Sequence, residues 1–426
     1  MGTLVLFGSF AALILLNVPI SFALLGSAIG TLAFLGQSPL PIAQRMVIGA
    51  DSTSLLAIPF FIAAGEIMNR GGATSRLIDL AYAMVGHVRG ALAQVAVVAH
   101  MFFAGISGSA VADTAAVGSA TVPAMLKAGY DRGFTAAVTG ASGAIGMIVP
   151  PSIAIIILGI SANISVAALF LAGIIPGIII GVVQCIHCYF YAIRNNYPVA
   201  GRFSLARLWV ELGRSALPLV TPALIVSGIV GGIFTPSEAG AVALVYALFL
   251  GAVVYRELTF RDIVQSLVDT TIVTGLVLFL VFASLSFSWI ITIERVPQAI
   301  ALQLLGITSN PWIMMLLMTL FVFLCGFVLD PTPAILILVP ILLPIATQYG
   351  MDPVHFGILF IINMAISHLL PPVGLVFYTT CSICNIPVTK AIRPMLPFVG
   401  FMLVELLVFT ALPDLVLFLP RLFLSK

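Results

Sequence analysis

The chain has 426 residues, of which 61% are hydrophobic and only 8% charged, and its formal net charge is +2. Soluble domains carry about 25% charged residues, so this composition excludes a soluble globular protein. The apolar residues fall in blocks of roughly 16–24, the length of a membrane-spanning helix, and strand-like alternation is missing. We therefore predict an all-α polytopic membrane protein. Because the chain has no basic tract, we expect no nucleic-acid partner.

The first predicted half covers residues 1–192 and begins with scaffold spans within 3–69. No Lys or Arg precedes the first apolar block and no small-residue cleavage site follows it, so we interpret it as a mature span rather than a signal peptide. The remaining predicted elements are an amphipathic arm at 75–88, a helical hairpin at 91–127, a helix broken by Pro150-Pro151 at 133–168, and a last span at 171–192.

A polar segment, 193–215, links this half to a second one at 216–426. The second half presents the same order of elements. These are scaffold spans within 216–291, an arm at 294–306, a hairpin at 311–348, a helix broken by Pro371-Pro372 at 354–386, and a span at 394–419.

A shift of 221 residues superimposes the two halves without gaps over some 50 positions. Most of the matching residues are Gly or Pro, which fix backbone shape, so the likeness concerns architecture. The identities are Phe102 with Phe323, Gly105 with Gly326, Pro123 with Pro344, Gly129 with Gly350, Asp131 with Asp352, and Pro150-Pro151 with Pro371-Pro372.

Charge placement decides whether the hairpins at 91–127 and 311–348 cross the membrane twice or re-enter. If both re-enter, the first half crosses five times and the second half is inverted. One face then holds thirteen of the 17 Lys and Arg residues, and the other holds only Arg45, Arg295, Arg421 and Lys426. Basic residues concentrate on the cytoplasmic side of the bacterial inner membrane. We therefore predict two inverted repeats, a cytoplasmic linker and periplasmic termini.

The two hairpin tips and the two Pro-Pro breaks expose backbone that a bilayer tolerates only inside protein or beside water. Inverted-repeat transporters place ion and substrate sites at such interruptions. Oxygen ligands suit a hard ion such as Na⁺, and we expect no other metal. The expected Na⁺ residues are Ser107, Ser109, Asp113, Gly143, Gly146, Gly326, Asp330, Thr332 and Ser367. The expected substrate residues are Ser142, Pro150, Asn363 and Pro371.

Structural roles compete with several of these assignments. A carboxylate within a membrane indicates a functional site, yet Asp330 also precedes Pro331 and a new helix, where it would serve as an N-cap. Ser107 and Ser109 are equally suited to capping. Thr235 to Glu238 forms a capping box, which we interpret as structural. We interpret His100, His187 and His368 as packed side chains because their spacing to acidic residues is not that of ligands.

The tips and breaks belong to motifs that resemble the large membrane subunit of tripartite ATP-independent periplasmic (TRAP) transporters over nearly the whole chain. This chain has Leu370 where the family usually has Thr before the second Pro-Pro, so it lacks a hydroxyl there. The matching stretches are Ile58-Pro59-Phe60-Phe61 through Gly65-Glu66-Ile67-Met68-Asn69, Ser107 to Thr114, Pro150-Pro151-Ser152, Phe234 to Ala241, Asp330 with Pro333 to Pro340, and Pro371-Pro372-Val373-Gly374.

The resemblance implies a Na⁺-coupled elevator transporter subunit and not an enzyme. It implies two protein partners, a four-span small membrane subunit and a periplasmic substrate-binding protein, besides the surrounding membrane lipid. The substrate would be an organic acid, and sialic acid (N-acetylneuraminate) is the first one to test because it is prominent in the family.

Two alternatives stay open at this point. A stand-alone Na⁺-coupled dicarboxylate or anion carrier of related fold would transport without partners. An intramembrane serine protease is a remote alternative, because Gly105-Ile106-Ser107-Gly108 matches the G-x-S-G pattern, although it would need a His base. The chain has no P-loop, so we expect no ATP-driven step within it.

Overall fold

The computed structural model describes residues 1–305, 308 and 310–424 and builds them from helices alone. The last residue of the predicted arm, 306, and the end of the second repeat, 425–426, lie outside the described residues. The first half contains α1 (Gly2–Leu15), α2 (Ile20–Phe34), α3 (Leu40–Ala50), η1 (Thr53–Leu56), α4 (Ala57–Arg70), α5 (Ala73–Val85), α6 (Ala91–Ser107), α7 (Ala110–Lys127), α8 (Arg132–Gly143), η2 (Ala144–Met147), α9 (Ile153–Ala162) and α10 (Val166–Arg194).

The second half presents a similar order of helices after the connection 195–204. Its elements are α11 (Leu205–Val230), α12 (Pro236–Leu248), the π-helix η3 (Phe249–Val254), α13 (Phe260–Ile293), α14 (Val296–Leu305), α15 (Pro311–Gly326), α16 (Pro331–Gln348), α17 (Pro353–Ser367), α18 (Leu375–Ile383), α19 (Val388–Ala411) and α20 (Pro413–Leu424). Both halves thus contain a hairpin (α6–α7 and α15–α16) followed by an interrupted helix (α8–η2–α9 and α17–α18), as predicted.

Side chains that satisfy free backbone groups explain where many helices begin. Asp131 accepts a hydrogen bond from the Phe134 amide at the start of α8, and its repeat partner Asp352 accepts one from the Val354 amide at the start of α17. Thr235 and Glu238 form the predicted capping box of α12. Each such cap contributes about 1 kcal/mol. The sequence signals for these starts are therefore local and need no tertiary support.

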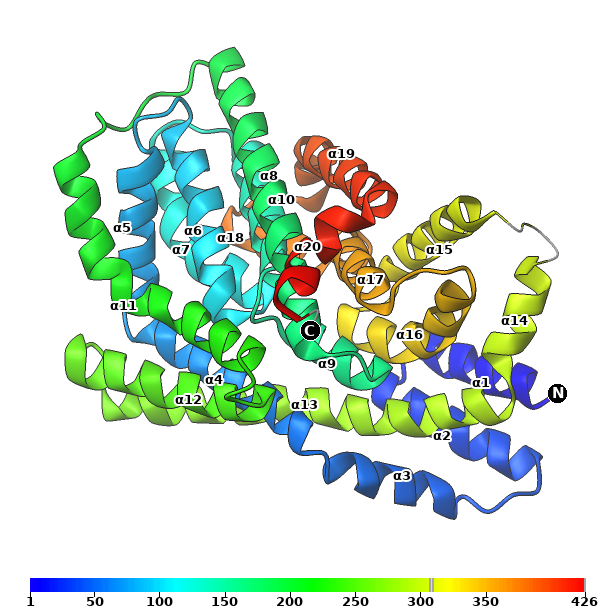
Figure 1. Ribbon diagram of the computed structural model, residues 1–426. Coiled ribbons are helices and arrows are strands. Elements are labelled where there is room, and N and C mark those ends of the chain that lie inside the picture. Colours follow the sequence, from blue (N-terminus) through cyan, green and yellow to red (C-terminus); the bar gives the residue numbers. More distant parts are fainter. Residues whose placement is uncertain (306–307, 309, 425–426) are drawn as a thin grey trace.

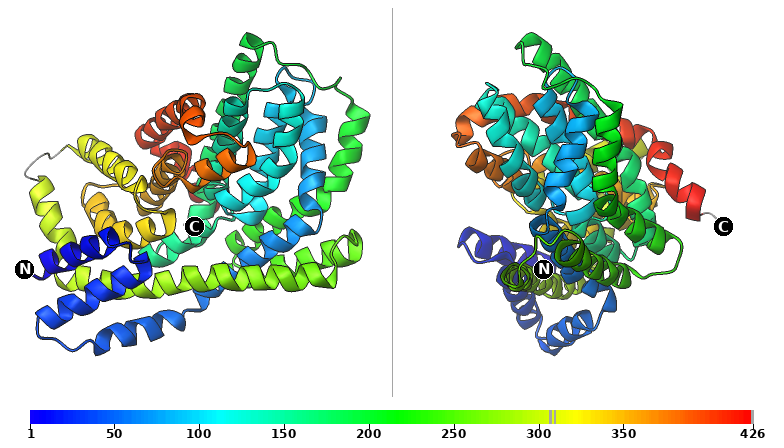
Figure 2. Two further views of the ribbon diagram at one scale, coloured as in Figure 1. Left: turned by 180° about the vertical axis from the view of Figure 1, so that it is seen from behind. Right: turned by 90° about the vertical axis from the view of Figure 1, so that its left-hand side faces the viewer.

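The helices form two groups (Figures 1 and 2). One group includes the long helix α13, and the other lies beside it. We call α1–α4 with α11–α13 the scaffold, in which α13 packs against α2, α3 and α4, and α12 packs against α4. We call α6–α10 with α15–α20 the transport body. Helix α16 lies against α13, and the Ser288 hydroxyl of α13 donates to the Leu336 carbonyl of α16 over 3.2 Å.

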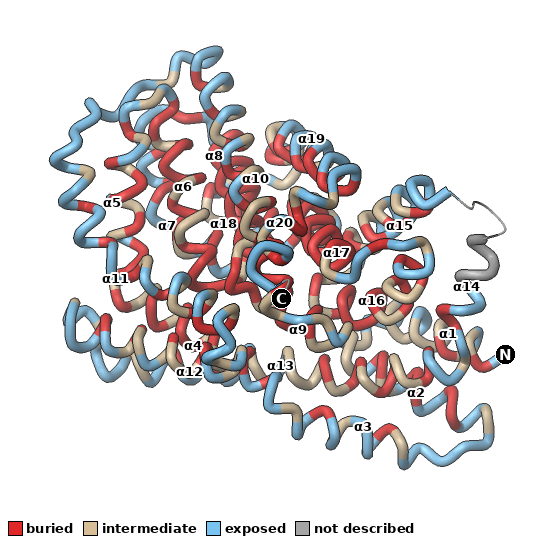
Figure 3. Tube along the Cα trace, in the orientation of Figure 1, coloured by how far each residue is buried: buried red, intermediate tan, exposed pale blue. Residues whose placement is uncertain are grey.

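Inside the transport body, the halves pack crosswise. Helix α9, which follows the first break, packs against α16 of the second hairpin, and α18, which follows the second break, packs against α7 and α8 of the first. Helices α10 and α19 hold corresponding places, since α10 packs on α17 and α19 packs on α8. Figure 3 shows that the buried residues gather in this crossing region. The helix that follows each break is therefore packed against the hairpin of the opposite repeat.

Three predicted segments differ from the structure. The end of the expected scaffold region 3–69 is not one straight span but two helices, α3 and η1–α4, bent by 57° at Asp51-Ser52, where Ser52 is extended. Half of the expected linker 193–215 is helical, because α11 starts at Leu205 with Ser204 accepting from the Arg207 amide. The last span ends at Ala411, since Leu412 precedes Pro413 and leaves the helical conformation.

Within the described residues, six helices are long and apolar enough to cross a membrane, and the bent α3–α4 pair would add a seventh. The hairpin helices α6 and α15 and the half-helices α9, α17 and α18 are apolar but shorter. Short apolar helices joined by turns within a protein body fit hairpins that re-enter rather than cross. The chain is thus a multi-pass, all-helical membrane protein.

Candidate functional site

The tip of the first hairpin is built from serine hydroxyls and one glycine. Ser107 ends α6, Gly108 has φ +65°, and the Ser109 hydroxyl accepts from the Ala112 amide at the start of α7. The tip touches the first break directly, because the Ile153 amide of α9 donates to the Gly108 carbonyl over 3.2 Å. Ser109 therefore caps a helix while standing at the predicted Na⁺ site.

Asp113 places a buried carboxylate at the first tip. Its side chain is fully buried, one carboxylate oxygen accepts from the Ser107 hydroxyl, and the other, Oδ2, has no hydrogen-bond partner. Oδ2 faces Gly146 of the break, where a Cβ atom would overlap it. A carboxylate buried in this way costs several kcal/mol unless a cation or proton meets it. The structure thus brings Ser107, Asp113 and Gly146 into one oxygen-bearing cluster.

Gly143 and Ser142 lie one turn before this cluster on α8. A Cβ at Gly143 would overlap the Thr114 hydroxyl of α7, so Gly143 sets the distance between break and hairpin. The Ser142 hydroxyl is buried and lies 3.0 Å from His100 Nδ1 of α6 and 2.6 Å from the Val138 carbonyl. Ser142, predicted to bind substrate, is therefore engaged with the hairpin arm and its own helix.

The second hairpin tip positions a carboxylate differently. Asp330 precedes α16 but makes no capping hydrogen bond with its side chain. Its Oδ1 lies 3.1 Å from His368 Nε2, an ion-pair distance, although the two groups lack the alignment of a hydrogen bond. His368 is buried, whereas the Asp330 side chain is 37% exposed. The structure thus offers no support for the capping alternative and gives Asp330 a partner from the second break.

The second break is held against α15 by the side chains of Asn363 and Ser367. Asn363, the repeat counterpart of Ser142, donates to the Thr319 carbonyl over 2.7 Å, and its Oδ1 is buried without a partner. Ser367 donates to the Asn363 carbonyl over 3.0 Å. A Cβ at Gly326 would overlap the Ser367 hydroxyl, so these two predicted residues meet. Thr332, in the first turn of α16, is half-buried.

The Pro-Pro steps end the half-helices because proline lacks an N–H donor. At the first break, the Ser152 hydroxyl satisfies one free backbone group on each side. It donates to the Met147 carbonyl over 2.7 Å and accepts from the Ile155 amide. Pro150 lines an apolar cavity of about 600 Å³ between α10, α11 and α20. Pro371 is half-buried, and the Tyr378 hydroxyl donates to the neighbouring Pro372 carbonyl. Neither proline offers a side-chain ligand, so a substrate role would rest on shape and carbonyls.

The structure therefore assembles the predicted residues into two clusters, one at each tip. Ser107, Ser109, Asp113, Gly143 and Gly146 gather at the first, and Gly326, Asp330, Asn363 and Ser367 at the second. The crosswise packing of α9 on α16 and α18 on α7 joins them within one body. Among the described residues, a hydrogen bond from the Ile153 amide to the Gly108 carbonyl and the ion pair of Asp330 with His368 connect each tip to its own break.

Three polar residues beside the clusters were not selected from the sequence. His368 approaches Asp330, His100 approaches Ser142, and Thr114 packs on Gly143. Only the position of His368 carried a signal, because it lies in the break directly after α17, whereas spacing along the chain does not reveal which helices face each other. The Ser107 hydroxyl donates to Asp113 rather than to a histidine, which removes the geometric basis for a serine protease.

Comparisons with known proteins agree with this architecture. Residues 7–415 match the family model of the tripartite ATP-independent periplasmic transporter, DctM component. The 2,3-diketo-L-gulonate TRAP transporter large permease protein YiaN of Escherichia coli is 38% identical over 98% of both chains. The sialic acid TRAP transporter large permease protein SiaM of Vibrio cholerae is 37% identical over 97% of both chains.

Among solved structures, the crystal structure of the Alcanivorax borkumensis YdaH transporter is similar in fold. It has a TM-score of 0.65 at 13% identity and covers 90% of this chain and 89% of its own. The relatives are named as permease subunits, which places the chain among transporters rather than enzymes. Members of this family are multi-pass proteins of the inner membrane. They act with a small membrane subunit and a periplasmic binding protein. The chain belongs to the TRAP transporter large permease (DctM) family.

Proposed function

We propose that this subunit couples the import of an organic acid to the inward movement of Na⁺. The observation that carries the proposal is Asp113, which is fully buried with an unpartnered carboxylate oxygen beside the Ser107 hydroxyl and the side-chain-free position Gly146. A hard cation is held by several oxygen atoms, and freed carbonyls at the break add to those of the side chains. Na⁺ bound there would neutralise the carboxylate and hold the hairpin against the break.

Replacement of Asp113 by Asn tests this proposal. In vesicles that contain the complex with its small subunit and binding protein, Na⁺-driven uptake should fall about 100-fold or more, because removing one charge of a buried pair costs roughly 3–5 kcal/mol. Asp131→Asn is the matched control, since Asp131 is an exposed N-cap that Asn replaces well. Unchanged uptake and Na⁺ dependence in Asp113→Asn would refute a Na⁺ site at this tip.

The same two tips support an elevator mechanism, in which the transport body carries its cargo along the scaffold. Such a movement must slide α16 along α13 and separate the Ser288 hydroxyl from the Leu336 carbonyl. Cysteines at positions 288 and 336, in a background without the native cysteines, should stop uptake when oxidised and restore it when reduced. A crosslinked protein that transports at the normal rate would contradict this movement.

The proposed substrate is an organic acid, and sialic acid is the first to test. Relatives of similar identity carry the names of different acids, among them 2,3-diketo-L-gulonate, sialic acid and C4-dicarboxylates, so the family name alone does not select between them. Calorimetric titration of the cognate binding protein with both acids, and with a C4-dicarboxylate as comparison, would identify the substrate class. Uptake by the large subunit alone would instead favour a stand-alone carrier.

We further propose a four-span small subunit and periplasmic chain termini. The N-terminus and the α13–α14 connection lie at one end of α13, and the α12–α13 connection lies at the other (Figure 1). That connection contains Arg256, and Arg261 lies in the first turn of α13. That separation agrees with the charge-based orientation. A reporter enzyme that is active only in the periplasm should be active when fused to the C-terminus, and activity of a cytoplasm-specific reporter would reverse the assignment.

A further inference from the structure

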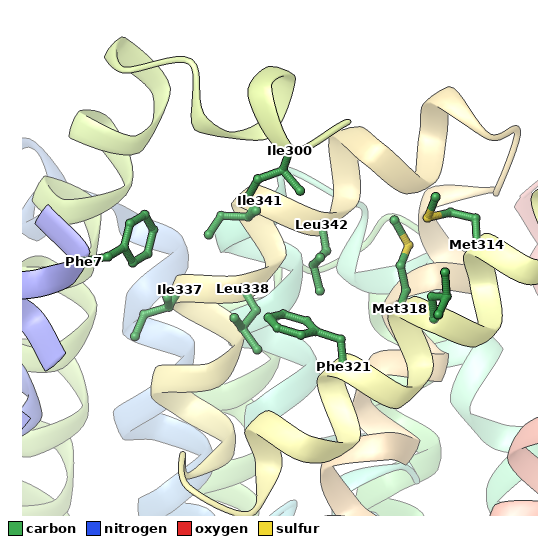
Figure 4. Close-up of a pocket in the computed structure, with 10 residues that line it drawn as sticks. Phe7, Ile300, Met314, Met318, Phe321, Ile337, Leu338, Ile341 and Leu342 are labelled. Carbon is green, nitrogen blue, oxygen red and sulfur yellow. The ribbon is translucent and has the colours of Figure 1, made fainter. Parts of the chain in front are cut away.

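A cavity of about 450 Å³ lies between the second hairpin, α1 and α14, and none of the residues proposed to bind Na⁺ or substrate lines it. Figure 4 shows side chains from four helices around it: Phe7 of α1, Ile300 of α14, Met318 and Phe321 of α15, and Leu338 and Leu342 of α16. The hairpin thus provides one wall, and the scaffold and arm provide the other. Any guest in this space touches both groups of helices.

The chemistry of the lining selects an apolar guest. Every lining residue is aliphatic, aromatic or a thioether, so the side chains offer water no conventional hydrogen-bond partner. The unbranched side chains of Met314 and Met318 adapt readily to flexible hydrocarbon. A carboxylate substrate or a cation would lose its hydration there without compensation. The cavity is therefore unsuited to the cargo that the two tips are proposed to handle.

The cavity continues onto a surface that faces the bilayer. Leu317 and Phe321 line it and are also exposed, and Leu316, Leu320 and Leu324 extend the same exposed apolar stretch along α15. In a multi-pass membrane protein, exposed apolar helix surface of this kind contacts acyl chains. Trp312, half exposed at the start of α15, is the residue type that marks the level of the lipid headgroups.

We propose that this cavity holds an acyl chain of a membrane phospholipid, inserted between the second hairpin and the scaffold. The acyl chain would fill the space between Phe7 and Ile300 on one side and Met318 and Leu338 on the other. Because opposite walls belong to different groups of helices, its binding depends on their relative position. That last consequence rests on the proposed elevator movement, whereas occupancy of the cavity does not.

The test uses the complex with its small subunit in vesicles of phosphatidylethanolamine and phosphatidylglycerol that contain a phospholipid with a photoactivatable acyl chain. After irradiation, peptides of α16 around Leu338 should carry the label, because the α16 side chains that line the cavity are buried and do not share the exposed apolar surface of α15. Leu338→Trp, which fills the cavity, should reduce labelling of these peptides about fivefold or more, as expected when added bulk occupies the available space. Leu320→Trp, on the exposed surface of α15, is the matched control and should leave it unchanged.

Equal labelling in the wild type and in Leu338→Trp would overturn the proposal. A photoreactive phenylalanine analogue at position 318 provides a second test. If it crosslinks to the small subunit instead of to lipid, the proposal is also overturned. If Leu338→Trp fails to assemble, Phe321→Ala provides the reverse test, because it widens the mouth and should increase labelling. Transport is not the readout, so loss of Na⁺ coupling in other variants leaves this test intact.

Discussion

The two hairpin tips occupy equivalent places in the repeat, but their carboxylates differ in burial and in hydrogen-bond or ion-pair partner. At the first tip, the carboxylate of Asp113 is fully buried and bonded to a serine of the same hairpin. At the second, the carboxylate of Asp330 is partly exposed and lies beside His368 of the break. Ser109, not Asp113, is the repeat counterpart of Asp330. The repeat therefore preserves backbone shape while placing the charge at different positions.

The positions of the glycine and of the polar residue are likewise exchanged between the two tips. At the first tip the break supplies the glycine, Gly146, and the hairpin supplies the polar group; at the second the hairpin supplies Gly326 and the break supplies Ser367. In both cases one partner must lack a side chain so that hairpin and break can touch. The comparison predicts that both tips are needed for transport and that variants at the two tips fail in different ways.

The largest expected effect concerns the exposed carboxylate. Asp330→Ala should abolish Na⁺-coupled uptake while leaving assembly with the small subunit intact, because this carboxylate caps no helix and is free to serve a ligand. Uptake at several Na⁺ concentrations and copurification of the subunits measure the two properties. Asp352→Ala, which removes a true helix cap, is the control. Normal uptake with normal Na⁺ dependence would remove Asp330 from the site.

The next effect concerns the glycine of the first break. Gly146→Ala places a methyl group against Asp113 Oδ2, and overpacking of roughly 1–3 kcal/mol should reduce uptake about tenfold to 100-fold. Gly400→Ala in α19, where a Cβ would meet nothing within 4 Å, is the matched control. Measurement of uptake against Na⁺ concentration should show a raised Na⁺ requirement. A variant whose curve superimposes on the wild type would show that the break does not constrain Asp113.

Ser107 offers a smaller and more specific comparison. Ser107→Ala removes the hydrogen bond to Asp113, which is worth roughly 1.5–3 kcal/mol when one partner is charged, so uptake should fall about tenfold or more. Parallel assays of peptide cleavage should show none in either protein. Ser119→Ala, at an exposed position of α7, serves as control. Lost cleavage with intact uptake would reverse the interpretation of this serine.

The smallest effect separates capping from ligand binding. Ser109→Ala should lower the free energy of unfolding by about 0.5–1 kcal/mol, because Ser109 caps α7, whereas Asp330→Ala should not, because Asp330 caps nothing. Thermal unfolding of the purified complex measures both. Equal losses of stability in the two variants would show that the tips do not differ in this respect.

The sequence by itself determined the features that depend on local backbone chemistry. The Gly and Pro register of 221 residues, the caps at Asp131, Asp352 and Thr235, and the Pro-Pro breaks are local effects, so the hairpins and interrupted helices could be predicted. The bend at Asp51-Ser52 was missed because the polar run of residues 51–54 is short and apolar residues flank it on both sides. The start of α11 was missed because charged residues interrupt its first turns, at Arg207, Glu211 and Arg214.

Only the tertiary structure decided which helices meet. It placed His368 beside Asp330, closed Gly146 onto Asp113, and packed α9 and α18 against the hairpins of the opposite repeat. These contacts join segments whose separation along the chain carries no record of their distance in space, so no local pattern encodes them. Burial then gave the two carboxylates their different roles, because the cost of a charge depends on what surrounds it rather than on its neighbours in sequence.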